Sequence, residues 1–402
     1  MILADVFNYF RRLCMNAYSL DPLNYPTSPS MSWDAMLYIT EVKLDLISDP
    51  DMHHFLKSAV RGGLVQCNQE TAKANNKFMD NFDPRKPTTY LASIEANNLS
   101  DWAMSQPLPF SNFTFLSDEE INMFEIKQTS SDADVGYILE VDLEYPNHLH
   151  KIHSGMPFCP ENQILPGGVH HKLTADFSDK KNYIIHLQHL QLCLQNRLVI
   201  TKIHRVMSFN QSRWLKPYID LNREKVELSK NEFERQFFKS MNSFIVGKSL
   251  ENVENYCDIA LLTHYQSKQN SPGFRQRVAR NNFRGIEIFP NNLAAIYSAK
   301  PQITNDKPLY IGVTVLELSK WFMYEHYYNF LSVKSPSSKI IFLSNNSIVV
   351  LLRENFYKLM EENPLRFDMN NYYLNGHNDN IDLMQDKNGG QVMKEFKEKY
   401  LG

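Results

Sequence analysis

Hydrophobic and polar residues follow two periods along this chain, and each period predicts a different kind of element. Residues 136–145 alternate strictly, which is typical of a strand. The two faces of this strand hold Tyr137, Leu139, Val141 and Leu143 on one side and Glu140, Asp142 and Glu144 on the other. Near the N-terminus, Val6, Phe10 and Leu13 instead recur every three or four residues. That spacing predicts a helix with one apolar face.

The same reasoning extends along the chain and predicts an α+β fold, because strands separated by helices include an antiparallel hairpin. We expect a mostly helical segment at 1–60, a strand at 89–94, a helix and then a strand at 183–207, and a long helical stretch at 220–250. The buried side of that stretch holds Phe233, Phe237, Phe238 and Met241. Later elements are strand-like structure at 285–300, a strand and then a helix at 308–330, and a hairpin at 340–352. Loops or connectors occupy 68–87, 112–135 and 155–182, and a short basic helix occupies 394–399 in the polar tail.

The expected hairpin joins two apolar runs, at 340–343 and 348–352, through a turn that carries no acid. The turn reads Ser344-Asn345-Asn346-Ser347. Asparagine and serine are good turn formers, so this pattern predicts a tight strand-turn-strand unit.

Composition narrows the class of protein. The chain has 402 residues, 43% of them hydrophobic and 12% aromatic, which suffices for a large core and favours two or three subdomains. Its net charge is −3, so any contact with DNA has to be local. The 5 cysteines are scattered without a CxxC pair, which favours free thiols in a reducing compartment. No run approaches about 18 apolar residues, so we expect a soluble intracellular protein without a membrane partner.

The first motif lies at 89–109 and reads Thr-Tyr-Leu-Ala-Ser-Ile-Glu-Ala-Asn-Asn-Leu-Ser-Asp-Trp-Ala-Met-Ser-Gln-Pro-Leu-Pro. It resembles motif A of the protein-primed family B DNA polymerases of linear plasmids and Maverick-type elements. The resemblance aligns the metal-binding aspartate of the family with Glu95 and its sugar-sensing tyrosine with Ser100, next to Asn98 and Leu99 at the nucleotide. Glu95 keeps a carboxylate but adds a methylene, which shifts a metal by a significant fraction of the ~4 Å between paired ions.

The second motif, at 238–248, reads Phe-Lys-Ser-Met-Asn-Ser-Phe-Ile-Val-Gly-Lys and resembles motif B on the fingers helix of these polymerases. The resemblance implies that Lys239 contacts the incoming triphosphate as a cation. It also places Ser243 and Gly247 at the nucleotide. An aromatic residue and two cations of the family pattern are replaced by Val246, Val226 and Glu227. A packed amphipathic helix explains 230–250 equally well.

The third motif is the hairpin turn, which falls where the family has Thr-Asp-Thr-Asp-Ser. The two aspartates, which hold a catalytic pair of Mg²⁺ ions in the family, become Ser344 and Asn346. These neutral groups do not supply the negative charge that holds two divalent ions together. If the missing charge stabilisation were ~5 kcal/mol, the rate would fall roughly 10³–10⁴-fold. We therefore expect no catalytic Mg²⁺ pair, and Glu95 is the one remaining metal-binding candidate.

Further positions resemble DNA contacts of the family. Arg61-Gly62-Gly63 is similar to its template-binding Gly-Gly motif, and Lys248 ends motif B. Arg275 and Arg277 belong to a basic cluster that could grip phosphates, although a solvated loop face explains it at least as well. Lys399-Tyr400 is similar to the Lys-x-Tyr primer-contact motif.

The resemblance implies the fold of a polymerase right hand: a palm with inserted fingers, a truncated thumb and no exonuclease domain. Its expected parts are an N-terminal helical region and linker at 1–87, palm at 88–180, fingers at 181–255, more palm at 256–360, and a thumb stub or tail at 361–402.

The implied function is DNA-directed DNA synthesis, impaired or lost because of Ser344 and Asn346. The implied partners are DNA, a deoxynucleoside triphosphate and a terminal protein, in the nucleus, or in a mitochondrion for a linear-plasmid origin. Two alternatives remain open. The chain could be a weak polymerase that uses a relocated acid such as Asp101 or Asp142, or a non-catalytic nucleic-acid-binding or interaction protein derived from a mobile element or virus.

Overall fold

The computed structural model describes residues 2–263, 272–304, 306–368, 383–388 and 392–397. Its first 60 residues form the helices α1 (Ile2–Tyr18), α2 (Ser28–Thr40) and α3 (Pro50–Ala59), which confirms the predicted helical segment. The side chains of Thr27 and Asp49 cap α2 and α3 by accepting hydrogen bonds from backbone N–H groups. A proline in the first turn of α2 and of α3 also favours helix initiation at these positions.

A central six-stranded sheet contains the predicted hairpin. Its strand order is β1-β13-β14-β3-β16-β15. The bounds are β1 (Gln66–Cys67), β3 (Tyr90–Ala96), β13 (Lys339–Leu343), β14 (Ser347–Leu352), β15 (Phe367–Asp368) and β16 (Met384–Asp386). Strands β13 and β14 form the expected hairpin, and β14 pairs antiparallel with β3 so that Ser347 lies opposite Glu95. Because β16 lies on the other side of β3, part of the C-terminal segment completes this sheet.

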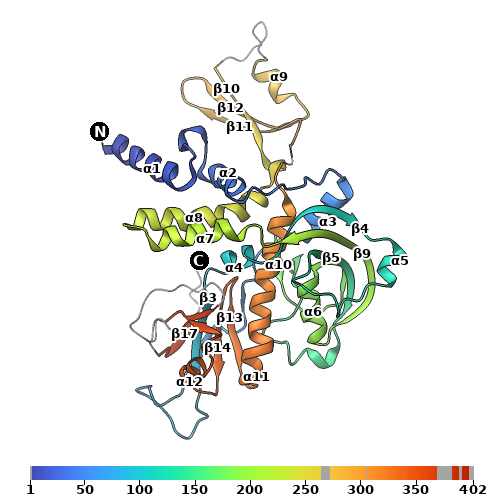
Figure 1. The fold of residues 1–402 in the computed structure, drawn as a ribbon, viewed down its shortest axis with the longest axis vertical. Coiled ribbons are helices and arrows are strands. Elements are labelled where there is room, and N and C mark those ends of the chain that lie inside the picture. The colour runs from blue at the N-terminus through green and yellow to red at the C-terminus, as the bar shows by residue number, and fades with distance from the viewer. Residues whose placement is uncertain (1, 264–271, 305, 369–382, 389–391, 398–402) are drawn as a thin grey trace.

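A second, four-stranded sheet has the order β4-β9-β5-β8. It consists of β4 (Leu108–Phe115), β5 (Val135–Glu144), β8 (Lys180–His186) and β9 (Val199–Ser212), with α6 (Leu187–Gln195) between β8 and β9. The alternating segment is therefore a strand, as predicted. Helix α10 (Leu309–Glu325) runs between the two sheets (Figure 1) and contacts α3, α6, α4 (Leu99–Met104) and α8 (Glu232–Ser249).

Two antiparallel helices, α7 (Lys216–Glu227) and α8 (Glu232–Ser249), replace the single long helical stretch expected at 220–250. The helical conformation is interrupted at 228–231, where the Asn231 side chain caps the start of α8. Phe237, Phe238 and Met241 are buried as predicted, but Phe233 is 48% exposed, so its assignment to the core was wrong. Helix α1 packs on this pair, with Phe10 against Phe237.

A small three-stranded sheet projects from the rest of the molecule (Figure 1). It is formed by β10 (Cys257–Leu262), β12 (Leu293–Ala299) and β11 (Phe283–Phe289), with α9 (Phe274–Val278) beside it. The strand prediction for 285–300 is confirmed, but this segment does not close the main core.

Other local predictions were wrong. The strand expected at the start of 308–330 is the first part of α10, because its residues from Tyr310 to Val315 are buried on every side, and a continuous apolar run does not distinguish a buried helix from a strand. The expected loop at 155–182 contains the hairpin β6 (Glu161–Ile164) and β7 (His171–Thr174). The connector contains α5 (Asp118–Asn122).

The basic helix expected at 394–399 is also wrong, because β17 (Glu395–Lys397) pairs with β2 (Thr71–Lys73). Lys399-Tyr400 lies outside the described residues. Helix α12 (Phe356–Glu361) follows β14. Within the described part of the chain, no helix is long and apolar enough to cross a membrane.

Candidate active site

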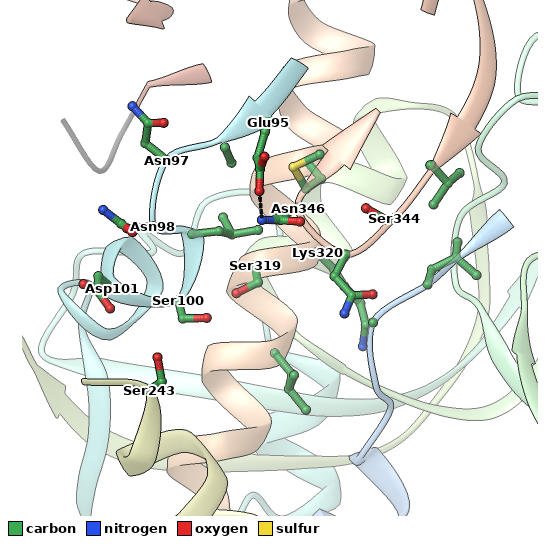
Figure 2. Close-up of a pocket in the computed structure, with 18 of the residues that line it drawn as sticks. Glu95, Asn97, Asn98, Ser100, Asp101, Ser243, Ser319, Lys320, Ser344 and Asn346 are labelled. Carbon is green, nitrogen blue, oxygen red and sulfur yellow. Dashed lines mark hydrogen bonds between the residues drawn. The ribbon is translucent and has the colours of Figure 1, made fainter. Parts of the chain in front are cut away.

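A cavity of about 640 Å³ opens where the predicted motifs meet. Its walls come from the end of β3 and α4 (Leu99–Met104), one face of α8, one face of α10, the hairpin turn and the Gly62-Gly63 segment (Figure 2). The fold brings together the candidates Glu95, Asn98, Leu99, Ser100, Lys239, Ser243, Gly62, Gly63, Ser344 and Asn346.

Motif A and the hairpin turn meet at Glu95. Asn346 Nδ2 donates a 2.6 Å hydrogen bond to Glu95 Oε1, although the two residues are 251 positions apart. Figure 2 shows this bond, which is formed by the turn of the hairpin. The backbone N–H of Ala96 also donates to the Asn346 carbonyl at 2.8 Å. The pairing of β3 with β14 therefore fixes the two positions against each other.

A lysine that the sequence analysis missed completes the surroundings of Glu95. Lys387 Nζ lies 3.2 Å from Glu95 Oε2. The β16–β3 pairing places Gln385 opposite Glu95 and leads directly to Lys387. No local pattern in the polar C-terminal tail indicates this contact, since it depends on a strand of 3 residues.

The donor set does not suit a pair of Mg²⁺ ions. Both oxygens of Glu95 already accept hydrogen bonds or a salt bridge from the protein. The Ser344 hydroxyl lies 2.7 Å from the Ser347 hydroxyl, so it forms a hydrogen bond within the turn. In the described ranges, no group of at least three His, Cys, Asp or Glu residues could hold a metal. Mg²⁺ prefers carboxylates with near-octahedral geometry. Among the described residues that line this cavity, the carboxylates are Glu95 and Asp101, and Asp101 lies on α4, where it accepts a hydrogen bond from Asn242.

The glycine pair packs against the turn. A Cβ on Gly63 would lie 1.9 Å from Asn345 Oδ1, whereas one on Gly62 would meet nothing within 4 Å. Arg61 turns the other way: its Nη1 donates a 2.7 Å hydrogen bond to the Ile184 carbonyl, and its guanidinium stacks 3.8 Å from the centre of the Tyr183 ring. The buried Arg61 side chain therefore has two partners within the protein, and its role as a DNA contact stays a prediction.

A buried ionic cluster holds this segment in place. Lys320 Nζ donates to the Arg61 carbonyl and to Glu317 Oε1, both at 3.1 Å. Glu317 Oε2 lies 3.1 Å from His189 Nδ1. Burial alone would raise the pKa of Glu317, but Lys320 and His189 hold that pKa well below its ordinary value.

Cations line the opposite wall on α8. Arg235 and Lys239 lie one helical turn apart and both face the cavity. They also line an adjoining cavity of about 500 Å³ that includes Arg223, Lys230 and Glu227. Arg235 was not among the residues predicted from the sequence, although its spacing of four residues from Lys239 places it on the same helix face.

Other predicted contacts lie away from the cavity lining. Lys248 Nζ forms a 2.7 Å salt bridge with Glu251 Oε2, beyond the cavity-facing part of α8, and Gly247 precedes it. Arg275 and Arg277 lie on α9 beside the projecting sheet, where Arg277 Nε donates to the Pro272 carbonyl at 3.2 Å. The structure therefore does not bring these four residues to the same cavity as Glu95.

The relocated acids considered above have other partners. Asp142 Oδ1 accepts from the Asn182 backbone N–H and pairs with His204 at 2.8 Å, and these contacts hold its pKa well below the usual range. Burial raises the pKa of Asp101 to about 6, and its carboxylate accepts a 2.9 Å hydrogen bond from Asn242 Nδ2. Asp101 lines the same cavity as Glu95 but comes from another element, the helix α4 (Figure 2).

Two solved structures resemble the fold of this chain. Phi29 DNA polymerase complexed with primer-template DNA matches 96% of this chain with a TM-score of 0.55 and 13% identity. Phi29 DNA polymerase in an orthorhombic crystal form matches 93% with a TM-score of 0.56 and 12% identity. The chain has a DNA-polymerase-like fold. It spans about 55% of the length of the first of these structures and 54% of the second.

The expected α+β polymerase fold is thus confirmed, while the division into palm, fingers and thumb segments stays a prediction. No protein-family model and no curated protein matches the chain.

Proposed function

We propose that this protein binds primer–template DNA and a nucleoside triphosphate in the cavity next to Glu95, but does not carry out two-metal nucleotidyl transfer. The observation that carries the proposal is the contact between Asn346 and Glu95. Glu95 and Asn346, which the resemblance aligns with metal-binding positions of the first and third motifs, contact each other; this supports one shared site in which one of the two residues carries an amide. The proposed site is thus one whose residues adjoin but which carries less negative charge than a two-metal centre.

The charges around the cavity support binding of a phosphorylated ligand. Arg235 and Lys239 on α8 face the space in front of Glu95, and a triphosphate there would receive charge-assisted hydrogen bonds. The solved structure with a TM-score of 0.55 is a complex with primer-template DNA, which supports DNA as the second ligand. A terminal protein, and a mobile element or virus as the source, are part of this proposal by resemblance only.

Two-metal catalysis needs paired negative charge that this centre does not offer. Ser344 and Asn346 supply a hydroxyl and an amide, and the single carboxylate of Glu95 is engaged by Asn346 and Lys387. Asp101 and Asp142 are held by partners of their own. These contacts favour loss of the chemistry over its transfer to another acid.

Binding assays on the full chain test the proposal. We expect a fluorescently labelled primer–template to bind, and a nucleoside triphosphate to tighten that complex. Arg235→Ala and Lys239→Ala should each weaken triphosphate binding by about tenfold, the loss of one charge-assisted contact. Lys334→Ala, which removes an exposed cation on α11 (Ser332–Lys334), is the matched control. Absence of DNA binding, or equal effects of all three substitutions, would contradict the proposal.

A further inference from the structure

Lys387 forms a salt bridge with Glu95 in the candidate site. Its ammonium group lies 3.2 Å from Glu95 Oε2, while Asn346 Nδ2 binds the other carboxylate oxygen at 2.6 Å. Its backbone N–H donates a 2.8 Å hydrogen bond to the Ser93 carbonyl on β3. The lysine is therefore positioned by the central sheet that also positions Glu95.

The charge of Glu95 matters to any ligand that carries phosphate. An uncompensated carboxylate repels a phosphate that lies in contact with it, and the repulsion is stronger where water is partly excluded. Divalent ions remove this repulsion in a two-metal centre. Here Lys387 supplies a positive charge to the carboxylate, and Asn346 supplies a neutral donor where a second carboxylate would add to the repulsion.

We infer that Lys387 takes over the charge-neutralising role of a divalent cation, so that the cavity accepts a phosphate-bearing ligand without metal. This inference rests on the proposed function and adds the ionic requirement of the site. The Lys387 side chain is 53% exposed, against 23% for Glu95. The ammonium group can therefore contact the carboxylate on one side and still face an entering phosphate on the other.

Binding of a labelled primer–template with a recessed 3′ end, measured by fluorescence anisotropy in EDTA and in Mg²⁺, tests the inference. We expect the wild-type dissociation constant to agree within about twofold between the two buffers. Lys387→Gln should weaken binding in EDTA by about tenfold, and Mg²⁺ should restore it because Glu95 is then available to a cation. Removing both charges, in Lys387→Gln with Glu95→Gln, should restore binding in EDTA.

Two controls separate this effect from a general loss of positive charge. Lys394→Gln removes a similarly exposed lysine that pairs with Asp80 at 3.1 Å in the same C-terminal segment, and it should leave binding unchanged in both buffers. Lys387→Arg keeps the charge and should bind DNA like the wild type in EDTA.

The outcomes distinguish the inference from the proposed function. Wild-type binding that requires Mg²⁺, or a Lys387→Gln variant that binds normally in EDTA, overturns the inference and leaves the proposed function standing. A double variant that stays as weak as Lys387→Gln also overturns it, because neutralisation of Glu95 would then not be what Lys387 provides. A wild-type protein that binds no DNA in either buffer overturns the proposed function itself.

Discussion

Replacing Asn346 by aspartate restores one carboxylate of the family pattern and tests how the present centre is stabilised. In the structure Asn346 Nδ2 donates to Glu95 Oε1 at 2.6 Å. A hydrogen bond to a charged group contributes about 1.5–3 kcal/mol. Two carboxylates about 4 Å apart would instead repel each other by roughly 4 kcal/mol at an effective dielectric constant near 20. Because Glu95 is partly exposed, screening reduces both effects, and we expect Asn346→Asp to lower the free energy of unfolding by about 2–3 kcal/mol at neutral pH without metal.

The pH and metal dependence of this loss should be diagnostic. The repulsion raises the pKa of the introduced carboxyl above its unfolded value, so the folded variant gains stability relative to the wild type as the pH falls toward 4 and loses it as the pH rises. Mg²⁺ should recover part of the loss at neutral pH, because two adjacent carboxylates then suit a divalent cation.

Urea unfolding at neutral and acid pH, with EDTA or Mg²⁺, measures these effects. Asn345→Asp is the matched control, since it adds the same charge one residue away on a side chain that faces Gly63. The reasoning is refuted if Asn346→Asp destabilises no more than Asn345→Asp, or if its effect is independent of both pH and Mg²⁺.

Three further substitutions probe the walls of the cavity. Gly63→Ala should lower the free energy of unfolding by no more than about 1 kcal/mol, because its Cβ would meet the end of the exposed Asn345 side chain, which can turn away; in urea unfolding Gly62→Ala should show no loss, and a loss above about 3 kcal/mol for Gly63→Ala would show that Asn345 is held in place. Asp101→Asn should stabilise the protein near pH 8 but not near pH 4, by up to about 3 kcal/mol, since burial disfavours the carboxylate that is ionised at pH 8, as its raised pKa of about 6 indicates, whereas near pH 4 the folded protein holds it protonated and neutral; a pH-independent difference in unfolding free energy would argue against it. Glu317→Gln should cost about 3–5 kcal/mol because it leaves a buried ammonium group unpaired, and a change below 1 kcal/mol in urea unfolding would be inconsistent with the buried cluster.

The sequence predicted the elements that have one apolar and one polar face, such as the strand at 136–145. The hairpin at 340–352, by contrast, follows from two apolar runs around a turn of serine and asparagine, and the family resemblance predicted that it contributes to one site with the strand that ends at Glu95. Helix α10 was partly misassigned because it is buried all round, which removes the amphipathic signal. The break between α7 and α8 depends on the Asn231 cap, a local signal that the broad apolar periodicity concealed.

The missed site residues depend on contacts between distant segments. Lys387 reaches Glu95 because β16 pairs with β3, and nothing near Lys387 in sequence encodes that pairing. Arg61 was assigned to DNA from its place in a motif, but the fold directs its side chain to Ile184 and Tyr183. Arg235 could have been found from helical spacing alone.

The claim that this polymerase-like fold lacks two-metal chemistry is tested most directly by primer extension. Purified protein is incubated with a primed template, the four deoxynucleoside triphosphates, and either Mg²⁺ or Mn²⁺, and the products are separated at single-nucleotide resolution. We predict no added nucleotide with either metal. Incorporation that disappears in Glu95→Ala would contradict the account, because it would show that the centre around Glu95 still holds catalytic metal ions.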